Sequence, residues 1–204
     1  MQVYVEATDK KAFACAVDWP GWCRAGRNED AALEQLIAYT DRYAEVAELA
    51  GVRFRPGKPE VVERIAGNAT TTFGAPGVVP ALDDGAKVTG QAIELLEATW
   101  SYLDGVAVSA PTELRKGPRG GGRDRDKMLQ HVLGAEAAYA RQIGVKHKEP
   151  ELADRAAVAA LREGIVAALR AGDQQTKWPP RYFVRRTAWH VLDHAWEMQD
   201  RSES

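Results

Sequence analysis

Two histidines four residues apart, His190 and His194, are the residues of this chain best suited to chemistry. Side chains four apart on an α-helix lie one turn above each other on the same face, so both imidazoles can bind one metal ion. A third histidine, His131, lies in another stretch with helical character, residues 127–133. Three imidazoles and one open coordination position are typical of a catalytic metal site rather than a structural one. The sequence therefore predicts a metal centre at the place where the two helices meet.

The chemistry that this centre predicts begins with a metal-bound nucleophile. A divalent ion on three imidazoles lowers the pKa of a bound water or thiol, which gives a nucleophile near neutral pH. Imidazole-rich sites suit zinc, nickel, copper and iron alike, which leaves the metal open, with zinc as the first choice here and nickel as the second. The helical half contains neither a cysteine nor a Gly-x-Ser-x-Gly motif, which disfavours covalent catalysis by the protein. We therefore expect attack by a metal-bound water or by an external low-molecular-weight thiol.

Glu197 is the acidic residue that we assign to the same helix face. It follows His194 by three residues and His190 by seven. We interpret it as a catalytic general base or as a partner that holds an imidazole in place. An exposed carboxylate at the helix end is an equally weighted alternative. Asp193 follows His190 by three residues but lies on the flank of the face, and is the weaker candidate.

Aromatic and basic residues near these histidines give weaker signals. Three tryptophans, Trp100, Trp189 and Trp196, are candidates for the walls of a pocket, although aromatic residues on helices more often belong to the core. The fourth histidine, His147, lies in a polar turn and is expected to face solvent. The basic, Gly-rich stretch 116–123 is interpreted as a mobile, solvated crossover, with anion binding as the less favoured alternative.

Four stretches with helical spacing of apolar residues must position these side chains. They cover residues 90–103, 126–143, 150–170 and 181–201, and they are expected to end near Gly105, Gly144, Gly172 and the C-terminus. Almost no strand pattern follows residue 85. Four amphipathic helices without strands predict a four-helix bundle, in which side chains on facing helices commonly build metal sites.

The first 80 residues differ in pattern and are expected to mix strands with a helix. Strands are predicted at residues 3–6, 12–17 and 61–65. A helix is predicted to begin after the N-cap Asn28 and to end at Gly51. The predicted class is therefore α+β, with a small β–α domain over residues 1–80 and the bundle over residues 81–204.

Composition limits the classes of partner. Among the 204 residues, 27 are Lys or Arg and 29 are Asp or Glu, so the net charge of −2 favours neither nucleic acid nor an anionic membrane. No apolar run approaches membrane-spanning length, and the N-terminus lacks a signal-peptide core. Cys15 and Cys23 are interpreted as two reduced thiols of a cytoplasmic protein.

The second half resembles the DinB/YfiT superfamily of metalloenzymes over residues 86–201. The resemblance rests on Gln130-His131-Val132-Leu133-Gly134-Ala135-Glu136 and on Arg185-Arg186-Thr187-Ala188-Trp189-His190-Val191-Leu192-Asp193-His194. It implies a four-helix bundle whose metal is held by His131, His190 and His194. The superfamily includes thiol S-transferases that use low-molecular-weight thiols, maleylpyruvate isomerases and many members without assigned activity, so it implies the metal better than the substrate.

Residues 3–50 resemble the fold of HicB-type antitoxins. The matching segments are Asp18-Trp19-Pro20-Gly21-Trp22-Cys23-Arg24-Ala25-Gly26 and Glu29-Asp30-Ala31-Ala32-Leu33. In that family the fold is a module that binds a partner toxin. This chain shows no basic arm or separate DNA-reading segment, which disfavours a transcriptional role. A small cap packed on the second half is the more strongly weighted alternative.

Taken together, the sequence predicts a divalent-metal-dependent enzyme acting on a small-molecule substrate. Its expected activity is thiol S-transferase-like, with a hydrolase as the near neighbour and a low-molecular-weight thiol as the co-substrate. The alternative is a non-catalytic HicB-like interaction module fused to a metal-stabilised bundle in stress response. A bundle that has lost its chemistry and only forms a homodimer is the third possibility. The sequence leaves the substrate and the oligomeric state open.

Overall fold

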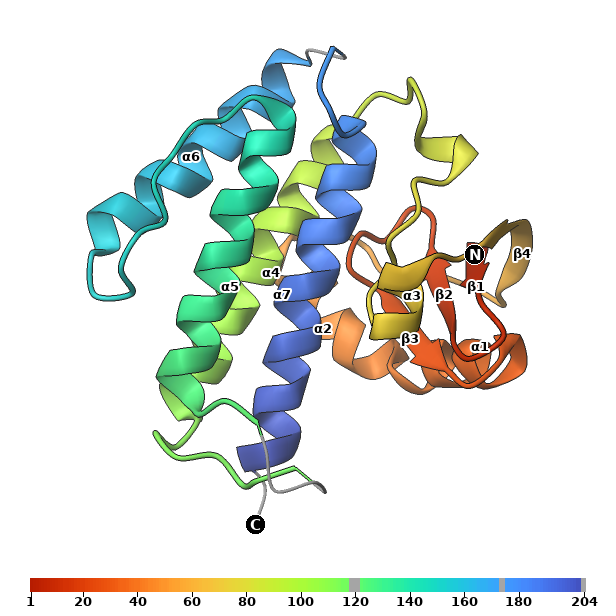
Figure 1. The fold of residues 1–204 in the computed structure, drawn as a ribbon, viewed down its shortest axis with the longest axis horizontal. Helices are drawn as coiled ribbons and strands as arrows, with labels where there is room; N and C mark the ends of the chain where they lie inside the picture. The colour runs from red at the N-terminus through yellow and green to blue at the C-terminus, as the bar shows by residue number, and fades with distance from the viewer. Residues whose placement is uncertain (118–121, 173–174, 203–204) are drawn as a thin grey trace.

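A sheet-containing half and a helical half lie side by side in the structure, a computed structural model that describes residues 1–117, 122–172 and 175–202 (Figure 1). The first half contains β1 (Gln2–Ala7), β2 (Ala12–Ala16), β3 (Cys23–Gly26), α1 (Glu29–Ala38), α2 (Thr40–Leu49), β4 (Glu60–Ala66) and α3 (Ala69–Phe73). The second contains η1 (Ala81–Asp83), α4 (Gly90–Ser109), α5 (Arg125–Ala140), η2 (Arg141–Ile143), α6 (Arg155–Ala171) and α7 (Pro180–Ser202). The predicted α+β class is confirmed at this level.

The four strands form one sheet in the order β3-β2-β1-β4. β1 pairs antiparallel with β2 and parallel with β4, and β2 pairs antiparallel with β3. The strands predicted at residues 3–6, 12–17 and 61–65 are present. β3 was not predicted, because its four residues are too few to show an alternating pattern and two of them are small.

The single helix predicted between Asn28 and Gly51 is wrong, since the structure has two helices there. Asn28 caps α1 as expected, with its side chain accepting a hydrogen bond from the backbone N–H of Ala31 at 2.9 Å. The chain bends at Tyr39, which ends α1 and begins α2. The Tyr39 ring packs edge-on against Trp196 of α7, 5.0 Å between centroids. We attribute the bend to this tertiary contact, which local spacing does not encode.

The interpretation of Cys15 and Cys23 as reduced thiols is wrong for this structure, in which they form a disulfide. The two residues lie directly opposite each other on β2 and β3, with their Cα atoms 4.1 Å apart. The turn between the strands contains Gly21 at φ +90°, a conformation that favours glycine. An antiparallel register brings residues of low sequence separation together, and an isolated cysteine count does not reveal it.

The helical half has the four main helices that the sequence predicts. Two boundaries differ: α4 continues through Gly105 to Ser109, and α6 begins only after its N-cap Asp154 rather than at Pro150. A glycine inside a helix costs only about 0.5–1 kcal/mol relative to alanine, which the packing of α4 against α7 offsets. Gly144 and Gly172 end helices in left-handed conformations as expected. Of the stretch 116–123, residues 118–121 lie outside the described part.

The two halves share one hydrophobic core, and α7 runs through it. Arg185 of α7 makes one of the polar connections between them. Its guanidinium makes two hydrogen bonds to Asp83, at 2.6 and 3.0 Å, and donates to the carbonyls of Ala16 and Val17 at 2.9 and 2.7 Å. Both side chains are buried. The hydrogen bonds to these two carbonyls fix α7, and with it two of the candidate ligands, against the end of β2. Among the described helices, none is long and apolar enough to cross a membrane.

Candidate metal centre

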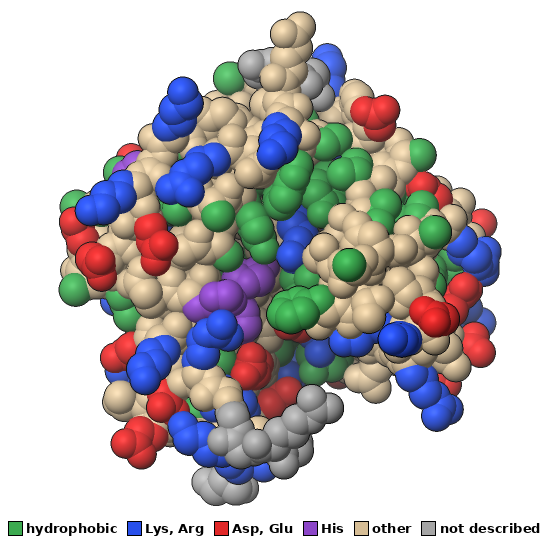
Figure 2. Space-filling view, viewed as in Figure 1, with side chains coloured by type: hydrophobic (Ala, Val, Ile, Leu, Met, Phe, Trp, Pro, Cys, Tyr) green, Lys and Arg blue, Asp and Glu red, His purple; other side chains and the backbone are tan. Residues whose placement is uncertain are grey.

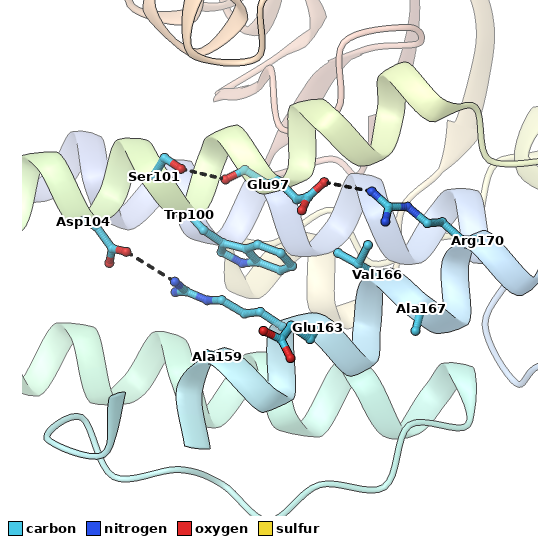
Figure 3. Close-up of a pocket in the computed structure, with 10 residues that line it drawn as sticks. Glu97, Trp100, Ser101, Asp104, Ala159, Glu163, Val166, Ala167 and Arg170 are labelled. Atoms are coloured by element: carbon cyan, nitrogen blue, oxygen red, sulfur yellow. Dashed lines mark hydrogen bonds and ion pairs between the residues drawn. The ribbon is translucent and has the colours of Figure 1, made fainter. Parts of the chain in front are cut away.

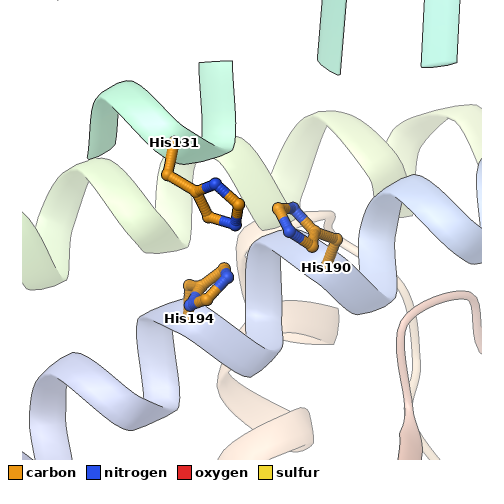
Figure 4. Close-up of side chains that lie close together, drawn as sticks. All are labelled: His131, His190 and His194. Carbon is orange, nitrogen blue, oxygen red and sulfur yellow. The ribbon is translucent and has the colours of Figure 1, made fainter. Parts of the chain in front are cut away.

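The structure brings the three predicted histidines together. His131 comes from α5, and His190 and His194 come from successive turns of α7. Figure 4 shows the three rings converging on a common point. One nitrogen from each ring lies within 4.8 Å of the others, and the ring centroids are 4.7–5.1 Å apart. In a tetrahedral zinc site the ligand nitrogens are about 3.4 Å apart, so small side-chain rotations are sufficient to bind an ion.

The environment keeps two of these imidazoles neutral, as metal ligation requires. Burial lowers the pKa of His190 well below its ordinary value, and the nearby positive groups of His194 and Arg186 lower it further. Burial also lowers the pKa of His131, with a smaller contribution from the charge of Arg123, while Glu197 opposes the shift. The lowered pKa values favour the neutral imidazole, in which one ring nitrogen carries a lone pair for a metal and the other carries the proton.

A second observation supports the fit of a metal to these residues. Nδ1 of His190 is buried and, within the described part of the chain, has no hydrogen-bond partner. A buried polar nitrogen without a partner costs free energy. Coordination to a metal ion, or a hydrogen bond to a bound molecule, removes that cost. The site thus has ligands of the correct chemistry and an unsatisfied atom that a ligand can satisfy.

Glu197 lies against His194 rather than toward the centre of the cluster. Its Oε2 is 3.2 Å from Nδ1 of His194, and its Oε1 accepts a hydrogen bond from Arg201 at 2.9 Å. The hydrogen bond with His194 lowers the pKa of Glu197, burial raises it, and the hydrogen bond from Arg201 lowers it again. A carboxylate engaged at both oxygens is a weak proton acceptor. The geometry therefore favours the orienting role for Glu197, leaving Nε2 of His194 free for the metal; its assignment as a catalytic base remains a prediction.

Replacing Glu197 by glutamine is expected to weaken zinc binding by about 10- to 100-fold, because the amide no longer fixes the His194 tautomer or raises its basicity. Competition with a chromophoric chelator measures the affinity. Asp193→Asn is the matched control: Asp193 is on the same helix but pairs with Arg24 at 2.9 Å and not with a histidine. Equal affinities of the Glu197 variant and the parent would contradict the orienting role.

The histidines lie at the floor of a hollow between the two halves. Figure 2 shows their side chains there, with a basic side chain and hydrophobic side chains beside them. Of the three predicted wall residues, Trp189 lies closest to the site, with its ring 6.2 Å from that of His190. Trp100 instead packs under Arg162, and Trp196 packs against Tyr39. The structure therefore places one of the three tryptophans at the site.

His147 is not part of the cluster, as predicted. It is half-exposed in the segment after η2, and its Nδ1 lies 2.6 Å from the carbonyl oxygen of Lys148. Two residues at the site were not singled out from the sequence: Tyr139, whose ring lies 5.9 Å from that of His190, and Arg186. The spacing contains a signal for Arg186, since it precedes His190 by four residues and so shares its helix face.

A groove of about 460 Å³ between α4 and α6 is one competing site (Figure 3). Four of its charged side chains form two pairs: Glu97 with Arg170 at 3.7 Å, and Asp104 with Arg162 at 3.5 Å. Arg162 also pairs with Glu136, whose carboxyl pKa is raised by burial. The groove residues that line it include no histidine or cysteine. The histidine cluster is therefore the better candidate for chemistry.

Comparison with protein-family models, with curated proteins and with solved structures finds no match to this chain.

Proposed function

We propose that this protein is a metal-dependent enzyme whose centre is formed by His131, His190 and His194. A divalent ion bound there supplies a Lewis acid that lowers the pKa of a bound water or thiol. The observation that carries the proposal is the convergence of three imidazoles from two helices at the floor of a hollow. The resemblance of the helical half to the DinB/YfiT superfamily supports the same conclusion.

The side chains of the protein have separable roles in this proposal. The three histidines hold the metal, and Glu197 orients His194 through its hydrogen bond to Nδ1. Trp189 and Tyr139 border His190 and keep bulk water from one side of it. Both cysteines form the disulfide between β2 and β3 rather than lying at the cluster, so we assign the attacking atom to solvent or to a thiol co-substrate.

We favour thiol transfer over hydrolysis, in line with the superfamily that the helical half resembles. In such a reaction the thiolate sulfur attacks an electrophilic carbon, a C–S bond forms, the leaving group departs with the bonding electrons, and the thiol proton passes to solvent. Hydrolysis at the same centre replaces the thiolate by hydroxide. Zinc is the first choice of metal and nickel the second, because imidazole ligands suit both.

The test compares zinc-loaded protein with a His190→Ala/His194→Ala variant on two reactions. One is the displacement of chloride from 1-chloro-2,4-dinitrobenzene by cysteine or glutathione, and the other is the hydrolysis of p-nitrophenyl acetate. We expect acceleration of the first, lost in the variant. Acceleration of the second alone would identify a hydrolase. Equal rates for both proteins in both reactions would contradict the proposal and favour the non-catalytic alternative.

For the first half we propose a HicB-like module. The order of three antiparallel strands, two helices and a fourth strand parallel to β1 supports it. Its close packing on α7 through Arg185 and through the shared core also supports the simpler role of a cap that closes one side of the hollow. We favour the role of a cap, because the first half then forms one side of the hollow that contains the histidines.

A further inference from the structure

Arg186 is a buried cation without a visible counter-ion. It lies on α7, and its side chain is only 9% exposed. Among the described residues no acidic side chain pairs with it, and its Nη1 is fully buried without a hydrogen-bond acceptor. A guanidinium has five N–H donors and stays charged at all relevant pH values. Leaving such a group buried and unpaired is costly, so its retention requires an explanation.

The neighbouring arginine shows how this protein otherwise treats a buried guanidinium. Arg185 is buried to a similar degree, but it is paired with Asp83 and also bonds two backbone carbonyls. Arg186 has aromatic neighbours instead: its Cζ lies 4.6 Å from the ring centroid of Trp189 and 5.3 Å from that of Tyr139. These cation–π contacts hold the guanidinium in place, but they offer no acceptor for its N–H groups.

The position of Arg186 relates it to the histidine cluster. It precedes His190 by four residues, which places the two side chains about 5–6 Å apart at their Cβ atoms on one face of α7. Tyr139 contacts both of them, with its ring 5.9 Å from that of His190. A molecule bound by Arg186 on this face would lie next to His190.

We propose that Arg186 is a binding residue for the carboxylate group of a small organic acid, the substrate class of this site. A carboxylate matches the planar guanidinium in a two-bond, in-plane pairing and supplies the missing acceptors. One buried cation balances the single negative charge of a carboxylate. A phosphate dianion carries two negative charges and needs a second buried cation. Arg123 is the other arginine whose charge acts on His190, but it is exposed. The placement of the substrate over the metal rests on the proposed function. The binding of the anion by Arg186 does not.

The test is calorimetric titration of the full-length protein with benzoate, and with benzamide as its uncharged counterpart, in metal-free and zinc-loaded forms. We expect Arg186→Gln to weaken benzoate binding by about tenfold or more, and Arg186→Lys to weaken it less. Arg170→Gln is the control, because Arg170 is exposed on α6. The inference is overturned if the parent does not bind benzoate, if benzamide binds as tightly, or if the glutamine variant binds benzoate as the parent does.

A stability measurement separates a binding residue from a structural one. Replacing an unpaired buried charge by an apolar side chain of similar size is commonly neutral or stabilising, so Arg186→Met is expected to keep or raise the Tm of the ligand-free protein. A fall of more than about 5 °C would show that the arginine serves the fold and would overturn the inference.

The benzoate titration in metal-free protein also separates this inference from the proposed function. Binding that depends on Arg186 in a protein that takes up no zinc would leave the inference standing and defeat the metal centre. If the protein takes up zinc but the Arg186 variants bind benzoate as tightly as the parent, the metal centre stands and the inference about Arg186 is overturned.

Discussion

Replacing His190 by alanine is expected to lower the zinc affinity of the protein by about 60- to 700-fold. Total zinc-binding free energies of about 10–16 kcal/mol in four-ligand sites correspond to roughly 2.5–4 kcal/mol per ligand, and each 1.4 kcal/mol is a factor of ten. His190 is the most buried of the three candidate ligands, and its ring centroid lies 5.1 Å from that of His131 and 4.7 Å from that of His194. Affinity is measured by competition with a chelator of known strength, at one pH and one ionic strength.

His147→Ala is the matched control, because this fourth histidine lies outside the cluster. Its zinc affinity is expected to equal that of the parent within about twofold. We do not expect the His190→Ala variant to lose zinc affinity because its metal-free form is unstable. The Nδ1 of His190 is buried without a hydrogen-bond partner, so removing the imidazole removes an unsatisfied polar group. An affinity of the His190 variant within tenfold of the parent would mean that the zinc binds elsewhere.

Replacing Arg185 by methionine is expected to lower the free energy of unfolding by about 3–5 kcal/mol, because the change leaves the carboxylate of Asp83 buried without its main partner. Arg181 lies 3.4 Å from the same carboxylate but is more exposed and makes a longer contact, so it compensates only in part. The carbonyls of Ala16 and Val17 also lose the hydrogen bonds from Arg185, and Val17 keeps only the longer one from Arg181 at 3.4 Å. Urea denaturation followed by circular dichroism measures the change.

The double variant Arg185→Met/Asp83→Leu identifies the cause. When both charges are absent no buried ion is left uncompensated, and we expect at least half of the lost stability to return. Arg181→Met serves as the control and is expected to cost less than about 1 kcal/mol. If the double variant is less stable than Arg185→Met alone, the cost of the single change lies in packing or in the two carbonyls rather than in the stranded carboxylate.

The helices of the second half could be predicted because their apolar spacing and end signals are local properties of the sequence. Gly144 and Gly172 ended helices where expected, and Asn28 capped one where expected. The errors occurred where distant contacts decide the conformation. The bend at Tyr39 depends on packing against Trp196, a residue more than 150 positions away in the chain.

In the candidate site, too, the local features could be predicted from the sequence and the features that depend on distant contacts could not. The pair His190 and His194 follows from helix geometry alone, whereas the approach of His131 depends on the packing of α5 against α7. The pairing of Cys15 with Cys23 was missed because it follows from the register of two short strands. Arg186 was missed because spacing cannot distinguish an arginine that has a counter-ion from one that lacks it. That difference is visible only when the surrounding side chains are in place.

The most direct test of the metal centre is a titration of the metal-free protein with Co²⁺, followed by absorption spectroscopy. We expect about one ion per chain, intense visible bands of a four-coordinate ion, and a change in these bands when a thiol such as cysteine is added at constant pH, because one position is open. The His190→Ala/His194→Ala variant is expected to show no such bands. Failure of the parent to bind Co²⁺, or bands that are identical in the parent and the variant, would contradict the assignment of His131, His190 and His194 as a catalytic metal centre.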